Sequence, residues 1–320
     1  MGDKGHQEEP EDLPGEVRAA CAAVAARARQ VRIEAGAIAE YAAALPPPGP
    51  PAPDPRLELP GADRETRAAF AVCLDAVNFG SGWWPTIRKR PGHSGFFTVA
   101  AGLADRFRAA GPWRASELAS LSAAQVAATL GQDPAHPLMA QFAAARRDVG
   151  IHLVADHDGS FAAAVDSVAP AAPALAALFA SWEAFADVST YAAGGARLRV
   201  PFYKRAQLLA ADLDRAGVAR VAQLDRLTAF ADNLVPHVLR LDGVLVLDPA
   251  LAARIEAGDL LVHGSPEEVE LRAAAVHAVE LLAAARPDLT AAEIDAALWD
   301  RGRQPRYKAR PRPRCRNTAY

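Results

Sequence analysis

The fold class follows from the stretch EVRAACAAVAARARQVRIEAGAIAEYAAAL, which spans residues 16–45. Alanine, arginine and glutamate are strong helix formers, and apolar residues recur in this stretch at helical spacing. The stretch therefore predicts a single amphipathic helix over residues 16–45. That helix has to stop at residues 46–55, where seven prolines remove backbone donors and fix φ. We interpret this segment as a loop or short polyproline connector, with a site for a proline-recognising partner as the alternative.

Helical periodicity recurs along most of the remaining chain, whereas the alternation typical of strands is scarce. Residues 197–200 are the best strand candidate, and short strands are also expected around residues 86–89. Further helices are expected at residues 64–79, 94–109, 137–154, 161–168, 171–185, 203–216, 236–240, 248–257, 266–285 and 291–299, with two short ones opening near Ser116 and Ser122. These patterns predict an all-α fold with a minor β element. We expect one globular domain over residues 15–320 behind a disordered acidic tail over residues 1–14.

Composition narrows the class of protein. Hydrophobic residues make up 51% of the chain, which argues against disorder throughout, and the net charge of −3 gives no global attraction to nucleic acid or anionic membranes. Cys21, Cys73 and Cys315 are too far apart in sequence for a disulfide framework or a cysteine zinc site, which favours a reducing cytoplasm. The most apolar segment, residues 161–180, is interrupted by an aspartate and two prolines, so no membrane-spanning helix is expected.

The motifs that are absent from the sequence exclude several kinds of chemistry. No GxxxxGKS/T, GxGxxG or GxSxG pattern occurs, so ATP use, NAD use and serine hydrolase chemistry have no support. His152 and His157 lie near Asp156 and Asp158, but the segment lacks the long loop of an EF-hand, and no HExxH occurs. We interpret the segment as a turn and expect no metal site.

Two cations stand at an expected helix start in the stretch FYKRAQ, residues 202–207. Lys204 and Gln207 share a helix face, whereas Arg205 points about 100° away. Cations at the positive end of a helix dipole favour an anion such as a phosphate group. An ordinary solvated basic patch is the alternative.

A carboxylate follows in the stretch Phe230-Ala231-Asp232. Beside an aromatic wall, Asp232 could stabilise an oxocarbenium ion or attack it, as acidic residues do in glycoside cleavage. A turn aspartate or a helix N-cap is the alternative.

Other polar residues give weaker signals. Asp75 and Asn78 lie three positions apart before a Gly-Trp segment, where they could form a polar pair at the mouth of an aromatic pocket or simply cap a helix. Phe96 is one of several aromatics that could wall a planar base. Glu268, Glu270, Arg272 and Asp300 are expected in surface salt bridges and helix caps.

The segment from residue 301 to 316 is strongly basic. Its interleaved prolines argue against a helix, and its arginines could bind RNA phosphates. It lacks a base-stacking pattern, so we favour a solvated or back-folded tail.

Taken in order, these motifs resemble the queuosine salvage proteins. The matching stretches are residues 75–79, 94–96, 158–161, 202–208, 212, 230–232, 236, 268–272, 298–300, 314–315 and 320. The match begins near residue 16, and its most specific parts are the FYKRAQ and Phe-Ala-Asp stretches. Asn233 departs from the pattern, because animal members of the family have an aromatic residue at this position.

The resemblance implies a helical fold similar to helix-hairpin-helix DNA glycosylases. It also implies hydrolysis of the N-glycosidic bond of queuosine 5′-monophosphate, which releases queuine for reuse in tRNA modification and ribose 5-phosphate. No metal or organic cofactor, no membrane and no direct binding of tRNA is expected. The resemblance assigns catalysis to Asp232. Lys204 is the first candidate for holding the 5′-phosphate, with Arg205 as the alternative, and Asp75, Asn78, Phe96, Phe230, Asn233 and Asp300 are candidates for other substrate contacts. Two other functions stay open, a helical nucleic-acid-binding protein that uses the basic tail and a helical adaptor that uses the proline stretch.

Overall fold

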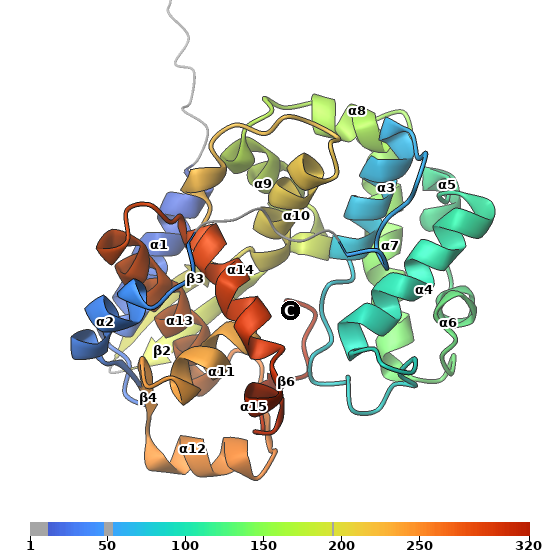
Figure 1. The fold of residues 1–320 in the computed structure, drawn as a ribbon. Coiled ribbons are helices and arrows are strands. Elements are labelled where there is room, and N and C mark those ends of the chain that lie inside the picture. Colours follow the sequence, from blue (N-terminus) through green and yellow to red (C-terminus); the bar gives the residue numbers. More distant parts are fainter. Residues whose placement is uncertain (1–11, 48–53, 194) are drawn as a thin grey trace, which may run out of the picture.

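The computed structural model describes residues 12–47, 54–193 and 195–320. Helices dominate and the strands are short, which confirms the expected all-α class with a minor β element (Figure 1). None of the helices in these ranges is long and apolar enough to cross a membrane.

The α-helices are α1 (Leu13–Ala25), α2 (Ile38–Ala43), α3 (Arg64–Asp75), α4 (Gly95–Ala110), α5 (Ala115–Leu118), α6 (Ala123–Leu130), α7 (Pro137–Asp156), α8 (Phe161–Asp166), α9 (Ala172–Ala180), α10 (Lys204–Arg215), α11 (Leu234–Leu241), α12 (Pro249–Glu256), α13 (Pro266–Ala285), α14 (Ala291–Gly302) and α15 (Pro305–Lys308). The short 3₁₀ helices are η1 (Ala35–Ala37), η2 (Glu183–Phe185) and η3 (Leu224–Arg226). Three two-stranded pairs join β1 (Val31–Ile33) to β4 (Leu245–Leu247), β2 (Val188–Ala193) to β3 (Ala196–Pro201), and β5 (Leu260–Leu261) to β6 (Arg314–Cys315).

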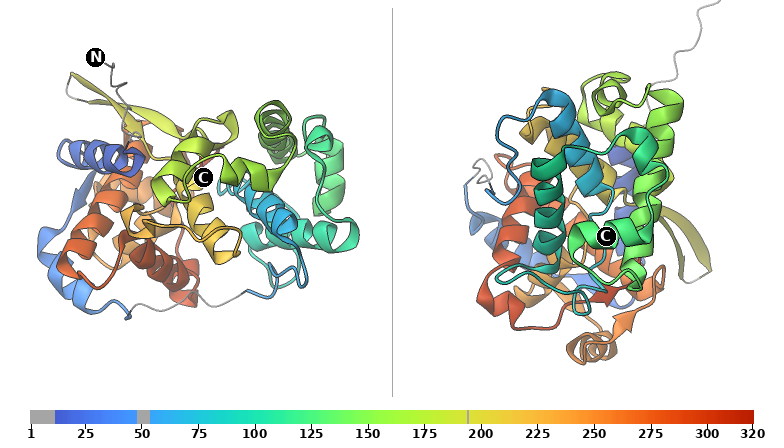
Figure 2. Two further views of the ribbon diagram at one scale, coloured as in Figure 1. Left: turned by 90° about the horizontal axis from the view of Figure 1, so that it is seen from above. Right: turned by 90° about the vertical axis from the view of Figure 1, so that its right-hand side faces the viewer.

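Apolar side chains of the described residues gather in two hydrophobic cores. One core combines α3 to α8 with faces of α9 and α10, and the other combines α1 and α2 with α11 to α14. The first group lies to the right in Figure 1 and the second to the left, and both are seen from above in Figure 2. Helix α9 serves both cores, because Leu175 packs into the first and Ala176 into the second. Residues near α10 therefore lie where the two cores meet.

The single helix predicted over residues 16–45 is wrong. Helix α1 starts earlier, at Leu13 behind the Asp12 cap, and ends at Ala25, after which the chain turns into strand β1. The physical reason is Glu270, whose carboxylate Oε2 accepts the main-chain N–H groups of residues 29, 30 and 31 at 3.1, 2.7 and 3.2 Å. This carboxylate provides a hydrogen-bond acceptor for main-chain N–H groups that have no partner once the helix has ended. Residues 1–11 of the expected tail lie outside the described residues, but Leu13 and Pro14 are helical.

Other predictions had mixed outcomes. The strand at residues 197–200 is confirmed within β3, and the Ser122–Gln125 capping box opens α6 as expected. No strand forms at residues 86–89 among the described residues. The prediction that prolines exclude a helix from the tail is wrong, because Pro305 occupies the first position of α15, where a missing N–H costs nothing. In the proline segment, residues 48–53 lie outside the described ranges.

The C-terminal segment returns between the two cores, where Figure 1 marks the chain end. The main-chain carbonyl of Tyr320 accepts the N–H of Gly80 at 3.0 Å, and the Tyr320 side chain is buried. A Cβ at Gly82 would lie 2.5 Å from the carbonyl oxygen of Cys315, so only glycine allows this approach. The back-folded reading of the basic tail is therefore confirmed.

Candidate active site

The FYKRAQ and Phe-Ala-Asp stretches are neighbours in space. Gln207 joins them: its Nε2 donates to the Phe202 carbonyl at 3.0 Å and to Thr228 Oγ1 at 2.9 Å, and its Oε1 accepts the Thr228 N–H at 3.0 Å. Tyr203 has a left-handed backbone, with φ +48°, as the chain turns from β3 into α10. A strained non-glycine residue at this turn aims the start of α10 at residues 228–232.

A buried ion pair holds the FYKRAQ and Phe-Ala-Asp stretches in place. The Arg272 guanidinium donates to the two Asp187 carboxylate oxygens at 2.9 and 2.7 Å, and its Nε donates to the Ala231 carbonyl at 3.0 Å. The same aspartate accepts the Lys204 N–H at 3.2 Å. Burial lowers the pKa of Arg272, but the charge and hydrogen bonds of Asp187 outweigh it, and the pKa is raised overall.

The surface position expected for residues 268, 270 and 272 is wrong, because all three side chains are buried. Arg272 is fully satisfied by Asp187 and Ala231, and Glu270 by three amides and the Tyr191 hydroxyl at 2.8 Å. Glu268 accepts the N–H of Gly264 at 3.0 Å. Solvated charges were expected here, but Glu270 and Arg272 meet partners that are distant in sequence, and Glu268 bonds to the loop just before its own helix.

Asp232 caps α11 with one oxygen and leaves the other free. Its Oδ1 accepts the N–H groups of Leu234 and Val235 at 2.7 and 3.1 Å, so Asp232 lies in the turn one residue before the N-cap residue Asn233 and bonds to the helix start, in line with the expected turn or capping role. Its second oxygen makes no hydrogen bond to any described residue, and the side chain is partly exposed. Asn233 donates from Nδ2 to the Pro313 carbonyl at 3.1 Å, so the basic tail borders this turn. A helix cap and a reactive carboxylate are thus compatible in this residue.

Lys204 lies beside Asp232 among several acids. Its ammonium donates to the main-chain carbonyl and to Oδ1 of Asn78, both at 3.1 Å, and the side chain is only 6% exposed. Burial lowers the pKa of Lys204, against the opposing charges of Asp232, Asp75 and Asp295. The charges of three carboxyl groups therefore act on this ammonium group, whose hydrogen bonds go to Asn78.

Asp75 lies deeper in the protein than Asn78, the hydrogen-bond partner of Lys204. It is fully buried, and its Oδ1 accepts the Asn78 amide at 3.2 Å. Burial and then the nearby Asp212 raise its pKa well above the usual value. Asn78, and not Asp75, therefore occupies the position closest to Lys204, and the predicted polar pair forms a row that leads into the protein.

Asp295 is a site residue that the sequence analysis missed. Its Oδ1 accepts the N–H of Phe230 at 2.9 Å, and its side chain is only 5% exposed. Burial and then the charge of Asp232 raise its pKa well above the usual value. The sequence did carry a signal, because Asp295 shares the apolar face of α14 with Ile294 and Leu298. An acid in such a face is buried when the helix packs.

Two predicted substrate contacts lie elsewhere. Arg205 is buried, and its guanidinium donates to the carbonyls of Ala76 and Ala319 at 2.6 and 3.3 Å, so it supports the packing of α10 and does not line the site. Asp300 is exposed and pairs with Arg303 at 3.0 Å. Neither side chain belongs to the cluster around Lys204.

The two aromatic candidates, Phe230 and Phe96, also lie apart from each other. Phe230 is almost buried next to Asp232, whereas Phe96 is half-buried and forms edge contacts with Phe97 and Trp299 at centroid distances of 5.2 and 6.4 Å. Among the described residues no ring contact joins Phe96 to Phe230. The two rings therefore do not touch, and their use as a sandwich stays a prediction.

One arginine of the basic tail reaches the site. Arg312 is half-buried, donates to the Gly302 carbonyl at 3.2 Å and forms no ion pair with a described residue. Burial lowers its pKa while the charge of Asp232 opposes that shift. Other tail arginines pair within the fold, for example Arg301 and Arg306 with Asp242. Four basic residues of the tail, Arg301, Arg303, Arg306 and Arg310, are therefore paired with acids of the fold.

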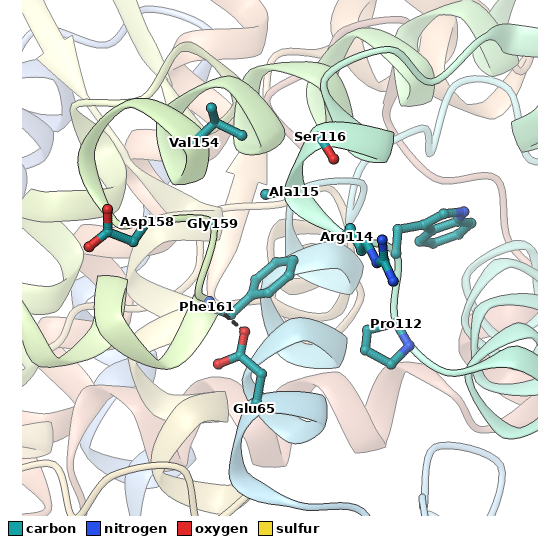
Figure 3. Close-up of a pocket in the computed structure, with 10 residues that line it drawn as sticks. Glu65, Pro112, Arg114, Ala115, Ser116, Val154, Asp158, Gly159 and Phe161 are labelled. Atoms are coloured by element: carbon teal, nitrogen blue, oxygen red, sulfur yellow. Dashed lines mark hydrogen bonds between the residues drawn. The ribbon is translucent and has the colours of Figure 1, made fainter.

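A cavity of about 570 Å³ lies away from this cluster, among the starts of α3, α5 and α8 and the end of α7 (Figure 3). Its half-buried carboxylate, Glu65, accepts the N–H groups of Phe161 and Ala162, both at 2.8 Å, and the Ser160 hydroxyl at 2.9 Å. With these bonds made, Glu65 has no free group for chemistry. We therefore place the candidate active site at Asp232 and not in this cavity.

The histidine segment is structural. His152 lies in α7 and stacks on Trp182 with ring centroids 4.9 Å apart, and a turn follows at residues 157–159 as expected. Within the described ranges, no group of three or more acidic, histidine or cysteine side chains is placed to hold a metal ion.

Similarity to known proteins agrees with this geometry. The family model described as queuosine salvage protein matches residues 59–320. A Sphaerobacter thermophilus protein named queuosine 5′-phosphate N-glycosylase/hydrolase is 34% identical over 311 residues, which cover 93% of this chain and 95% of that protein. A Dictyostelium discoideum protein of the same name is 29% identical over 267 residues, which cover 80% and 79% of the two chains. This chain therefore belongs to the queuosine salvage protein family.

Proposed function

We propose that this protein is an N-glycosidase that hydrolyses queuosine 5′-monophosphate to queuine and ribose 5-phosphate. The observation that carries the proposal is the free oxygen of Asp232, held beside Lys204 by the two stretches most specific to the family. The names of the bacterial and amoebal relatives agree with it. The three buried, unpaired cysteines fit a role in the cytoplasm.

Asp232 opposes the charge that forms on the ribose. Breaking the glycosidic bond leaves positive charge on C1′ and the ring oxygen, which a preorganised carboxylate stabilises. The two N–H groups of α11 fix Oδ1, so the free oxygen needs no reorientation during the reaction. Asp232 acts either as the nucleophile or as the group that stabilises the cation.

Two cations near Asp232 could take the 5′-phosphate. Lys204 has the right charge, but its ammonium already donates to Asn78 and faces three acids. Arg312 has a guanidinium without an ion-pair partner among the described residues, and such a fork binds phosphate well. Substituting Lys204 and Arg312 in turn decides between them: the residue that holds the phosphate is the one whose loss removes the preference for the phosphorylated substrate.

The base would lie on the side of Phe230 and Asn78. Phe230 offers an aromatic wall, and the Asn78 amide offers a polar group that is partly exposed. Phe96 can contribute only if the ligand spans the distance between the rings. Because the tail arginines are largely paired, we expect no direct binding of tRNA.

The first experiment measures free queuine by chromatography after the purified full chain is mixed with queuosine 5′-monophosphate, with guanosine 5′-monophosphate as control. We expect release from the first nucleotide only. Intact queuosine nucleotide after hours with a protein that binds it normally would refute the proposal.

Asp232→Asn tests the role of the carboxylate, because the amide keeps an oxygen for the cap. Removing this charge should lower turnover about 10²–10³-fold, or more if Asp232 is the nucleophile. Asp248→Asn is the matched control, since Asp248 caps α12 in the same way by accepting the Ala250 N–H at 2.9 Å. Wild-type turnover in Asp232→Asn would reject the assignment.

A further inference from the structure

A second carboxyl group faces the proposed reaction centre from a different helix. Asp295 projects from α14, and its Oδ1 is fixed by the Phe230 N–H at 2.9 Å. Its other oxygen has no hydrogen-bond partner among the described residues. Phe230 and Asp232 are separated by one residue, so the hydrogen bond of Asp295 holds the main chain two residues before Asp232.

The environments of the two acids differ. Asp232 is partly exposed and accepts two N–H groups at a helix start. Asp295 is almost fully buried and accepts one N–H group, and the charge of Asp232 disfavours a second ionised carboxylate beside it. Unequal environments divide two acids into a proton donor and an ionised partner.

We propose that Asp295 is the general acid that protonates the departing base. This inference rests on the proposed function and adds the source of the proton, which the reaction needs because a 7-deaza base has no N7 to accept one from solvent. As the C1′–N9 bond breaks, its electron pair moves to the base and the Asp295 O–H gives its proton to a base nitrogen. Water then adds to C1′ and its proton returns to the Asp295 carboxylate, so that queuine and ribose 5-phosphate leave an unchanged enzyme.

The test compares two leaving groups on the same sugar phosphate. Queuine needs a proton as it departs, whereas 4-nitrophenolate, released from 4-nitrophenyl ribofuranoside 5-phosphate, does not. In Asp295→Asn, the amide oxygen can still accept the Phe230 N–H. Loss of a general acid should lower queuine release about 10²–10⁴-fold. Nitrophenolate release should fall less than about fivefold if only proton transfer is lost.

Two control variants separate this role from others. Asp232→Asn should slow both substrates, and Asp259→Asn, an exposed acid, should slow neither. An equal loss on both substrates in Asp295→Asn would mean that Asp295 only positions Phe230, and unchanged queuine release would also overturn the inference. If the wild-type protein releases no queuine at all, the proposed function itself fails.

The pH profile gives a second readout that needs no variant. The titratable groups that face Asp295 are Asp232, ahead of α11, and Lys204, at the start of α10. A general acid must be protonated, so wild-type kcat for queuine release should fall at alkaline pH while kcat for nitrophenolate release does not. Parallel alkaline limbs for the two substrates would contradict the inference.

Discussion

Replacing Arg272 by methionine tests whether the buried ion pair supports the site. The substitution keeps much of the side-chain volume but leaves the Asp187 carboxylate buried without a counter-charge, and removes the donor to the Ala231 carbonyl. Breaking a buried pair by removing one partner typically costs about 3–5 kcal/mol. The guanidinium also lies 3.9 Å from the ring centre of Phe202 and 4.6 Å from that of Tyr320, which adds to the loss.

Chemical denaturation of the purified protein measures this change as a fall in the free energy of unfolding. Arg32→Met is the matched control, because Arg32 forms an exposed pair with Glu34 and its loss should cost less than about 1 kcal/mol. The double variant Arg272→Met/Asp187→Asn should be more stable than Arg272→Met alone, since the unpaired charge is gone. Turnover should fall in Arg272→Met and in the double variant, because each loses the hydrogen bond to the carbonyl of Ala231, the residue before Asp232.

A cost below about 1 kcal/mol for Arg272→Met would refute this reasoning, because it would mean that Asp187 finds another partner or takes up a proton at little cost. Failure of the double variant to recover stability would show instead that the contacts to Ala231 and the two rings, not the charge pair, dominate.

The remaining predictions concern the cations and the buried acids. Lys204→Met and Arg312→Met separate the phosphate contact: the variant that loses the preference of kcat/KM for queuosine 5′-monophosphate over queuosine identifies it, and an unchanged preference in both would exclude both. Asp75 and Asp212 have pKa values raised above the usual 3.8, so the folded protein binds more protons here than the unfolded chain. Their contribution to stability is full below about pH 4 and is lost as pH rises through the folded pKa values. Asp75→Asn should therefore flatten the fall in unfolding free energy as the pH rises above about 4, and an unchanged slope would argue against a raised pKa of Asp75 in the folded protein.

Local sequence patterns predicted most helices well, because each depends on contacts a few residues apart. Helix α13 agrees at both ends with the predicted range of residues 266–285, and the Pro-Glu-Glu start that follows the Ser265 cap explains why. The break after Ala25 was not predictable in this way. It depends on Glu270, which approaches the chain only in the folded protein.

In the candidate site, too, some features could be predicted from the sequence, whereas others depend on long-range packing. The order of motifs was enough to bring Lys204 and Asp232 together, since the family pattern carries tertiary information. It was not enough to show that Arg205 points into a core between Phe79 and Phe185, or that Asp295 enters the site from α14. Arginine and aspartate were expected at the surface, and only long-range packing decides when such groups are buried.

The division into two cores also orders events during synthesis on the ribosome. The first core uses residues between 68 and 230, so it is complete while the chain is still growing. The second core joins α1 and α2 to helices made at the end, so the earliest segments must wait for the last ones. A nascent chain that stops before α14 contains Lys204 and Asp232 but lacks Asp295. Under the roles proposed above, a truncated product would contain both residues but lack the proposed proton donor and part of the second core.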